Sequence, residues 1–123
     1  MEVIYALQNR IAYGSVQNLA GEFVRASTQS VTAAAAAATG GRMPKDFRVS
    51  ITNAEGSGAY PIASFTWLLL YQNPTDKERA RVMVDFLKWA ITDGQKFAPD
   101  LGYAQLPQPV VEKEMVALGK VAI

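Results

Sequence analysis

The sequence predicts an α/β fold in which a mixed sheet is flanked by helices. Three observations predict this class: apolar and polar residues alternate over 46–52, a continuous apolar run lies within 62–71, and apolar residues recur at helical spacing after residue 76. The chain has 123 residues, which suits one domain, and half of them are apolar, which favours a packed core over disorder.

The N-terminal part of the chain is expected to hold strands. Residues 2–13 (EVIYALQNRIAY) are rich in β-branched and aromatic side chains and predict one or two strands. A turn signal follows at residues 18–21 (NLAG), before the apolar stretch 22–25. We therefore expect a hairpin around residue 20.

Ser27 precedes a run of good helix formers. This arrangement predicts a helix over residues 28–38 that begins at a serine cap. Gly40 and Gly41 close the run, because glycine readily adopts the positive φ that helix ends favour.

Two strands are expected in the middle of the chain, separated by a loop at 53–58. Residues 46–52 (DFRVSIT) have the period of two that is typical of a half-buried strand. Residues 62–71 do not alternate, since Trp67 to Leu70 are all apolar, so both faces of this strand should be covered.

The next helix is introduced by Thr75 and Glu78, which have the spacing of a capping box. Its expected buried face consists of Val82, Phe86, Trp89 and Ala90, broadened by Met83 and Leu87. Trp67, Trp89 and the tyrosines are interpreted as core residues rather than as a stacking platform.

Asp93-Gly94 should end or kink this helix, and residues 95–104 read as short helix and loop. Pro107 and Pro109 then introduce a last helix. Val111, Met115 and Leu118 share one of its faces.

Composition excludes several function classes. The formal net charge is +1, from 12 basic and 11 acidic residues without a block of like charge, so nucleic acid is not an expected partner. The chain has no cysteine and no histidine, which removes the commonest nucleophile–base pairs and metal ligands. We expect no enzyme activity, no catalytic residue, no metal and no cofactor. The sequence also shows no signal peptide and no apolar run long enough to span a membrane.

One stretch could hold an anion by physics alone. A helix N-terminus beside Arg25, Ser27, Thr28 and Ser30 would offer free N–H groups, hydroxyls and a positive charge, so these four residues are the phosphate-binding candidates. The alternative, which we favour, is that Ser27 only caps its helix.

Other candidates are weaker. Gly56-Ser57-Gly58 lacks the lysine and the spacing of a phosphate loop and is interpreted as a flexible turn. Asp93 and Asp100 lack the spacing of a calcium loop.

Two long motifs resemble the periplasmic phosphate-binding proteins of phosphate ABC transporters. The first is TNAEGSGAYPIASFTWLLLY at residues 52–71, and the second combines FLKWAITDGQK at 86–96 with APDLGYAQLP at 98–107. Glu2 and the YALQN run at residues 5–9 also match the family, although Val3-Ile4 departs from it. The resemblance covers almost the whole chain.

The resemblance implies the C-terminal portion of a two-lobed fold of the periplasmic-binding-protein type. Residues 1–58 would end the second lobe, and residues 63–123 would form part of the first lobe. Between them, Ala59, Tyr60, Pro61 and Ile62 would be the interlobe crossover, or hinge, where proline limits how the connection bends.

The resemblance also implies a function: a segment of a phosphate-binding protein for ABC-type phosphate uptake, exported to the periplasm and serving a membrane permease. The family's phosphate ligands lie upstream of the matching region, so no ligand residue is carried over and the segment is expected to supply scaffold and hinge. The alternative is a stand-alone oligomerisation or interaction module derived from the same fold.

A partial fold should leave apolar surface uncovered. Burial stabilises by about 25 cal/mol per Å² of apolar surface, so an uncovered surface at residues 65–70 costs several kcal/mol. The sequence therefore predicts a homo-oligomer, with exchange of the C-terminal elements across Tyr60-Pro61 as one route.

Overall fold

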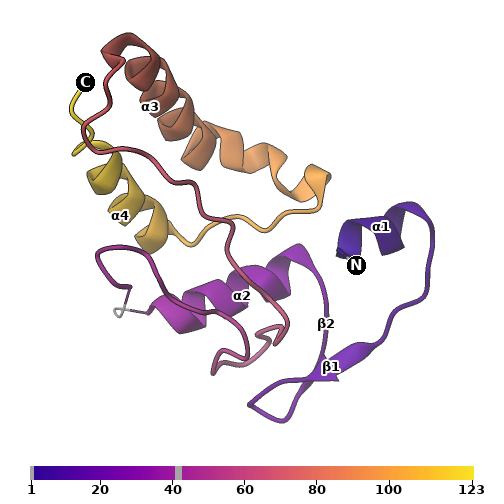
Figure 1. Ribbon diagram of the computed structural model, residues 1–123. Helices are drawn as coiled ribbons and strands as arrows, with labels where there is room; N and C mark the ends of the chain where they lie inside the picture. The colour runs from indigo at the N-terminus through magenta and orange to yellow at the C-terminus, as the bar shows by residue number, and fades with distance from the viewer. Residues whose placement is uncertain (1, 41–42) are drawn as a thin grey trace.

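The computed structural model describes residues 2–40 and 43–123. It is a small mixed α/β arrangement in which helices predominate and the sheet is minimal (Figure 1). The elements in chain order are α1 (Val3–Gln8), β1 (Ser15–Gln17), β2 (Phe23–Arg25), α2 (Thr28–Thr39), α3 (Lys77–Ile91), the 3₁₀ helices η1 (Asp93–Phe97) and η2 (Pro99–Leu101), and α4 (Gln108–Leu118).

The predicted hairpin is confirmed. β1 and β2 pair antiparallel, with Val16 opposite Val24, and the turn between them spans residues 18–22. Gly21 has a φ of +80°, which glycine adopts without steric cost. Among the described residues this hairpin is the whole sheet.

The helix predicted after Ser27 is also confirmed, as α2. Ser27 Oγ accepts a hydrogen bond from the Ser30 N–H, and the Ser30 side chain accepts one from the Ser27 N–H, which completes a capping box. The predicted glycine end is only partly right. Gly40 ends the helix at a φ of −51° rather than a positive one, and Gly41 lies outside the described residues.

The strand prediction for residues 2–13 is wrong, because this stretch begins with helix α1. Ala6, Leu7 and Gln8 favour helix, and the buried Ala6 lies on its inner face. Ile4 packs against Gly102, where an added Cβ would lie 2.7 Å from the Ile4 Cβ. This packing fixes the N-terminal helix against the loop after η2.

The strand predictions for 46–52 and 62–71 are wrong within the described residues, so the expected mixed sheet does not form there. A strand requires a neighbour to complete its hydrogen-bond ladder, and neither segment has one. Phe47, with a φ of +60°, also interrupts the first segment. Residues 63–71 instead run as irregular chain from the α2 region to the start of α3 (Figure 1). The loop predicted at 53–58 is confirmed.

The N-cap of helix α3 lies one residue later than predicted. Asp76, not Thr75, is the N-cap, and its carboxylate accepts a hydrogen bond from the Arg79 N–H. The 3₁₀ turns after Thr92 and the last helix after Pro107 agree with the sequence prediction.

The predicted buried face of α3 is right at Leu87 and wrong for its large side chains at 82, 83, 86 and 89. Val84 and Leu87 are buried, together with Leu118 of α4, whereas Val82, Phe86 and Trp89 are exposed. The reason is that α4 packs on the stripe that contains Val84 and Leu87, whose spacing of three residues is equally helical. Met83 is also exposed on α3, and Met115 is exposed on α4.

The prediction that the tryptophans and tyrosines are core residues is wrong for most of them, although Tyr13 and Tyr60 are half-buried. Trp67 and Trp89 are about half exposed, and Tyr5, Tyr71 and Tyr103 are exposed. Trp89 lies between Phe86 and Phe97 in a surface cluster, with ring centroids 5.8 and 6.3 Å away.

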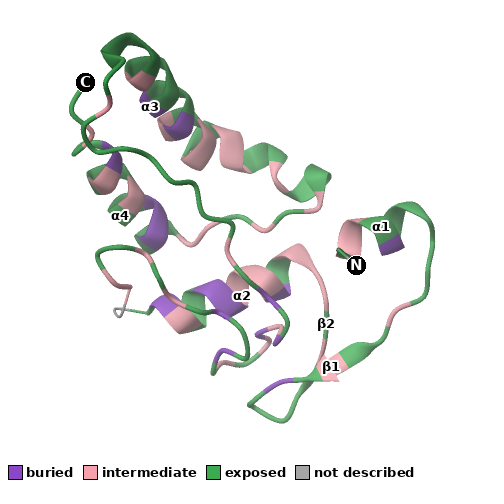
Figure 2. Cartoon of the chain, in the orientation of Figure 1, coloured by how far each residue is buried: buried purple, intermediate pink, exposed green. Residues whose placement is uncertain are grey.

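The core consists of two small clusters. The first contains Ala34, Ala35, Ile51, Ala54, Ala59 and Ala63, and the second contains Val84, Leu87 and Leu118. Figure 2 shows the buried residues gathered on α2, its adjacent loop and the facing sides of α3 and α4, while the connecting chain is largely exposed. A hydrogen bond from Thr32 Oγ1 to the Gln105 carbonyl, at 2.9 Å, links α2 to the chain just before α4.

The packing of α1 predicts the effect of a substitution at Gly102. Gly102→Ala should lower the free energy of unfolding by about 1–3 kcal/mol, because φ is +79° and the new Cβ overlaps Ile4. Urea denaturation measures this change. Gly14→Ala is the matched control, since nothing lies within 4 Å of its added Cβ. Equal stabilities for the two variants would contradict the placement of α1.

Candidate functional site

The predicted crossover, residues 59–62, is held against α2. The Tyr60 N–H donates to the Ser30 carbonyl at 3.0 Å, and the Pro61 carbonyl accepts from the Asn53 N–H at 2.8 Å. Ala59 and Pro61 are buried, whereas Ile62 is exposed. The peptide groups of Tyr60 and Pro61 are therefore tied to the first core cluster, and the chain leaves that cluster after Phe65.

Asn18 connects the hairpin to this crossover. Its side chain is buried, and its Nδ2 lies 3.3 Å from the Gly56 carbonyl oxygen and 3.2 Å from the Ala59 carbonyl oxygen. Its Oδ1 accepts a hydrogen bond from the Glu22 N–H at 3.0 Å. A buried carboxamide that meets both its donor and acceptor needs in this way fixes the relative position of two loops.

The turn at Gly56-Ser57-Gly58 binds the carboxylate of Glu22 from the same chain. Glu22 Oε1 accepts from the Ser57 hydroxyl at 2.9 Å, and Glu22 Oε2 accepts from the Gly58 N–H at 2.7 Å. These hydrogen bonds, with a further one from Asn18, lower the pKa of Glu22, the Gly58 N–H having the largest effect. The sequence predicted a flexible turn here and did not indicate its partner, because a carboxylate 35 residues upstream leaves no local signal.

The phosphate-binding candidates Arg25, Ser27, Thr28 and Ser30 lie at the start of α2. Ser27 and Ser30 satisfy each other, and the Ser30 hydroxyl also donates to the Arg25 carbonyl at 2.9 Å. The Arg25 guanidinium lies over the Tyr13 ring, 4.3 Å from its centroid, and the Thr28 hydroxyl donates to Gln29 Oε1. The geometry is that of a closed helix cap, which the sequence analysis favoured.

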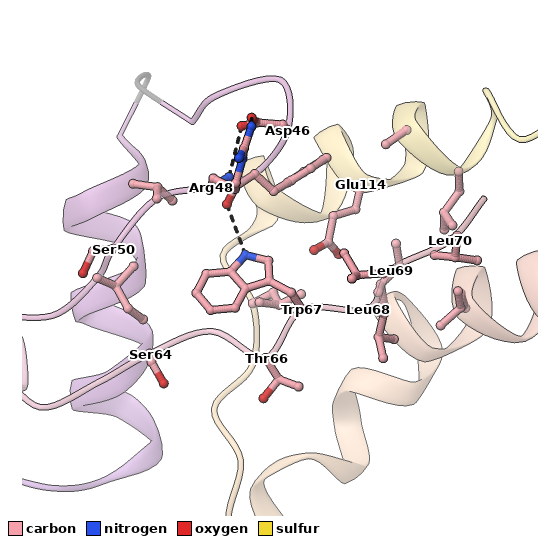
Figure 3. A pocket seen from close by; sticks show the side chains of 18 of the residues that line it. Asp46, Arg48, Ser50, Ser64, Thr66, Trp67, Leu68, Leu69, Leu70 and Glu114 are labelled. Carbon is pink, nitrogen blue, oxygen red and sulfur yellow. Dashed lines mark hydrogen bonds and ion pairs between the residues drawn. The ribbon is translucent and has the colours of Figure 1, made fainter. Parts of the chain in front are cut away.

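An apolar groove of about 1140 Å³ opens in the middle of the molecule. Its walls are the segments 46–52 and 64–70 together with the facing sides of α3 and α4, and Figure 3 shows Trp67 between these walls. The Trp67 Nε1–H donates to the Phe47 carbonyl at 3.2 Å, which is a direct link between the two segments. The groove is the space between two extended segments that were predicted to be strands.

Two acidic residues line this groove, and their pKa values are shifted in opposite directions. Asp46 forms an exposed ion pair with Arg48 at 2.7 Å, and the hydrogen bonds from Arg48 lower the pKa of Asp46. Burial raises the pKa of Glu114, whose side chain extends from α4 toward Leu69 in Figure 3. Neither arrangement pairs an acid with a base near a reactive group, so the groove has no catalytic constellation.

Within residues 2–40 and 43–123, no group of three or more acidic side chains lies close enough to hold a metal ion. The helices in the same ranges are too short or too polar to cross a membrane.

Comparison with known proteins confirms the predicted resemblance: the chain is homologous to one portion of a family of phosphate-binding proteins. It is 40% identical to the phosphate-binding protein PstS of Xylella fastidiosa (strain Temecula1) over 113 residues, which are 92% of this chain and 31% of that protein. It is 36% identical to the PstS of Pasteurella multocida, over 92% of this chain and 33% of the relative. The PstS of Methanocaldococcus jannaschii is 33% identical over 90% of this chain and 31% of the relative. No family model matches the chain.

The chain spans about a third of the length of the curated relatives that it matches. Its similarity is therefore to one portion of these phosphate-binding proteins. The relatives are named as binding proteins, which agrees with the sequence prediction that this chain is not an enzyme.

The geometry around Glu22 predicts a pH-dependent stability. Its folded-state pKa is below the ordinary value of 4.5, so ionised Glu22 stabilises the folded chain above that pH, and the contribution is lost as the pH falls through the folded-state pKa. Glu22→Gln should therefore lower the thermal midpoint at pH 7, and the difference from the native sequence should shrink by pH 3. Thermal denaturation at both pH values measures it.

The matched control is Glu55→Gln, which changes an exposed acid in the loop that receives Glu22. This variant should unfold like the native sequence at both pH values. A Glu22→Gln deficit that is as large at pH 3 as at pH 7 would show that the carboxylate charge is not what the turn binds.

Proposed function

We propose that the chain is the C-terminal segment of a periplasmic phosphate-binding protein that serves ABC-type phosphate uptake. The observation that carries this proposal is the identity of 40% over 92% of the chain with a phosphate-binding protein. The two motifs at residues 52–71 and 86–107 add support, since they extend through both halves of the segment. In the complete protein the segment would help form the surface that meets a membrane permease.

The proposed role of the segment is scaffold and hinge. Residues 1–58 would belong to one lobe, residues 59–62 to the crossover, and residues 63–123 to the other lobe. The division of the core supports two units in part, because the second cluster uses side chains from residues 84–118 alone, whereas the first uses residues 34–59 and extends past the crossover to Ala63 and Phe65. Two cores with separate residue sets are typical of two packing units.

The phosphate contacts are proposed to come from the part of the protein outside this segment. The closed cap at Ser27 supports this assignment, since the hydroxyls of Ser27 and Ser30 already hydrogen-bond to each other and to the backbone. The turn at 56–58 is likewise filled by Glu22. An anion would have to displace these internal partners to bind at either place.

Isothermal titration of phosphate into the purified chain tests this assignment, with sulfate as the control anion. We expect no binding heat for either anion, because the segment lacks the ligands. Phosphate-selective binding would contradict the scaffold role. Arg25→Ala would then test whether the start of α2 is the site.

A chimera tests the proposed family role directly. This chain would replace the matching 113 residues of the Xylella fastidiosa (strain Temecula1) relative, and the chimera should bind phosphate in the same titration. Arg25→Ala within the chimera should leave phosphate affinity unchanged. A chimera that folds cooperatively and binds no phosphate would contradict the proposal.

We also propose that the isolated chain self-associates. Large apolar side chains are exposed along residues 67–71 and on α3, and covering them is favourable by about 25 cal/mol per Å². The hydrogen bonds that fix residues 59–62 to α2 favour pairing of intact copies over exchange of residues 63–123.

Light scattering coupled to gel filtration measures the association state. At micromolar concentration the molar mass should be at least twice the 13.3 kDa of one chain. A single species of 13.3 kDa at that concentration would contradict self-association.

A further inference from the structure

The hairpin formed by β1 and β2, residues 15–25, lies at the edge of the molecule (Figure 1) and is held to the rest of the fold mainly by hydrogen bonds. All of its residues are described, and Asn18 alone among them is buried. Its cross-strand pair Val16 and Val24 is half-buried, and neither valine belongs to the two core clusters of the described residues. Apolar packing therefore contributes little to the position of the hairpin.

The tip of the hairpin, residues 18–22, makes these hydrogen bonds with two side chains. Glu22 accepts from the Ser57 hydroxyl at 2.9 Å and from the Gly58 N–H at 2.7 Å. The two loop carbonyls that bind Asn18 lie farther from it, at 3.2 and 3.3 Å. The hydrogen bonds to Glu22 are thus the shorter ones, and their acceptor is charged, which makes a hydrogen bond roughly twice as strong.

The base of the hairpin, where the chain enters α2, is fixed independently of the tip. The Ser30 hydroxyl donates to the Arg25 carbonyl at 2.9 Å. The Arg25 guanidinium lies over the Tyr13 ring, and the Tyr13 hydroxyl donates to the Ala26 carbonyl at 3.4 Å. The base can therefore act as a pivot when the tip is released.

The loop that receives the tip has its own anchors. Ala54 and Ala59 are buried in the first core cluster, and the Tyr60 N–H donates to the Ser30 carbonyl at 3.0 Å. Because these contacts do not involve the hairpin, the loop is expected to stay in place when the tip leaves it.

We propose that the hairpin is a flap that the charge of Glu22 keeps docked. With Glu22 ionised the tip stays on the loop, and without that charge the tip leaves while the loop and α2 keep their positions. The physical basis is that a neutral side chain offers the Ser57 hydroxyl and the Gly58 N–H a weaker acceptor than a carboxylate does. This device belongs to the segment itself and is independent of the family role proposed above.

The charges around Glu22 leave the neutral donors in control. The hairpin also carries Arg25 and the loop carries Glu55, whereas α2 has no charged residue. Neither of the ion pairs in the described residues includes Glu22. The hydrogen bonds from Gly58, Ser57 and Asn18 lower the pKa of Glu22 below its ordinary value of 4.5. The docked state is therefore favoured above the folded-state pKa and weakens as the pH falls through it.

Spin labels measure the position of the tip directly, because the chain has no cysteine of its own. Leu19→Cys places one label on the exposed tip, and Ala36→Cys places the other on the exposed side of α2. Double electron–electron resonance of the doubly labelled chain at pH 7 should give one narrow distance distribution. Adding Glu22→Gln, which keeps the shape of the side chain and removes its charge, should raise the ratio of undocked to docked tip about tenfold and broaden the distribution.

Two further variants make the test specific to the charge. Glu55→Gln is the matched control, since it neutralises an exposed acid of the same loop, and it should leave the distribution narrow. Ser57→Ala removes one donor and keeps the charge of Glu22, so it should raise the undocked fraction less than Glu22→Gln does. Circular dichroism confirms that each variant is folded.

Amide hydrogen exchange separates release of the tip from a wider loss of structure. The Tyr60 N–H, bound to Ser30 of α2, should exchange as slowly in Glu22→Gln as in the native chain. A distance distribution that Glu22→Gln leaves unchanged would overturn the proposal, and so would exchange at Tyr60 that accelerates as much as the tip undocks. The phosphate titrations are unaffected by either result and test the family role separately.

Discussion

The buried carboxamide of Asn18 holds together the part of the molecule on which the rest depends. It joins the hairpin to the carbonyls of Gly56 and Ala59, and the neighbouring Glu22 binds the turn between them. The Tyr60 N–H also donates to the Ser30 carbonyl of α2, and this hydrogen bond fixes the direction of the chain at the crossover. The path of residues 63–71, and with it the groove, follows from that anchor.

Beyond the anchor, the chain buries only a small part of its own apolar surface. Half of the buried hydrophobic residues in the described ranges are alanines, while most of the large side chains on α3 and along residues 67–71 stay exposed. Alanine burial contributes little, so the two clusters are small cores. This imbalance agrees with the match of the chain to only about a third of the length of its relatives.

Local signals in the sequence predicted local structure. The Ser27 cap, the hairpin turn and the proline-led helix α4 were predicted because each depends on neighbouring residues. The strands at 46–52 and 62–71 failed because a strand depends on partners elsewhere in the chain, and the described residues supply none. The α3 face failed for the same reason, since α4 selects the stripe with Val84 over the stripe with Phe86.

The candidate site shows the same division. A closed cap at Ser27 was predicted from one short stretch, whereas the binding of Glu22 by Gly58 spans 36 residues and was not. The motif at residues 52–71 predicted the resemblance correctly, because a motif is recognised from the sequence alone and does not depend on contacts between distant residues. One physical claim follows: residues 64–71 are irregular chain whose backbone makes no hydrogen bond within the described residues.

Amide hydrogen exchange, measured at a concentration where the chain is monomeric, tests that claim most directly. The account predicts that the N–H groups of residues 64–71 exchange at rates close to those of unstructured peptide, while those in the middle of α2 and α3 exchange more slowly. Protection of residues 64–71 equal to that of α3 in the monomer would mean that the segment already has partners within one chain, and would contradict the account.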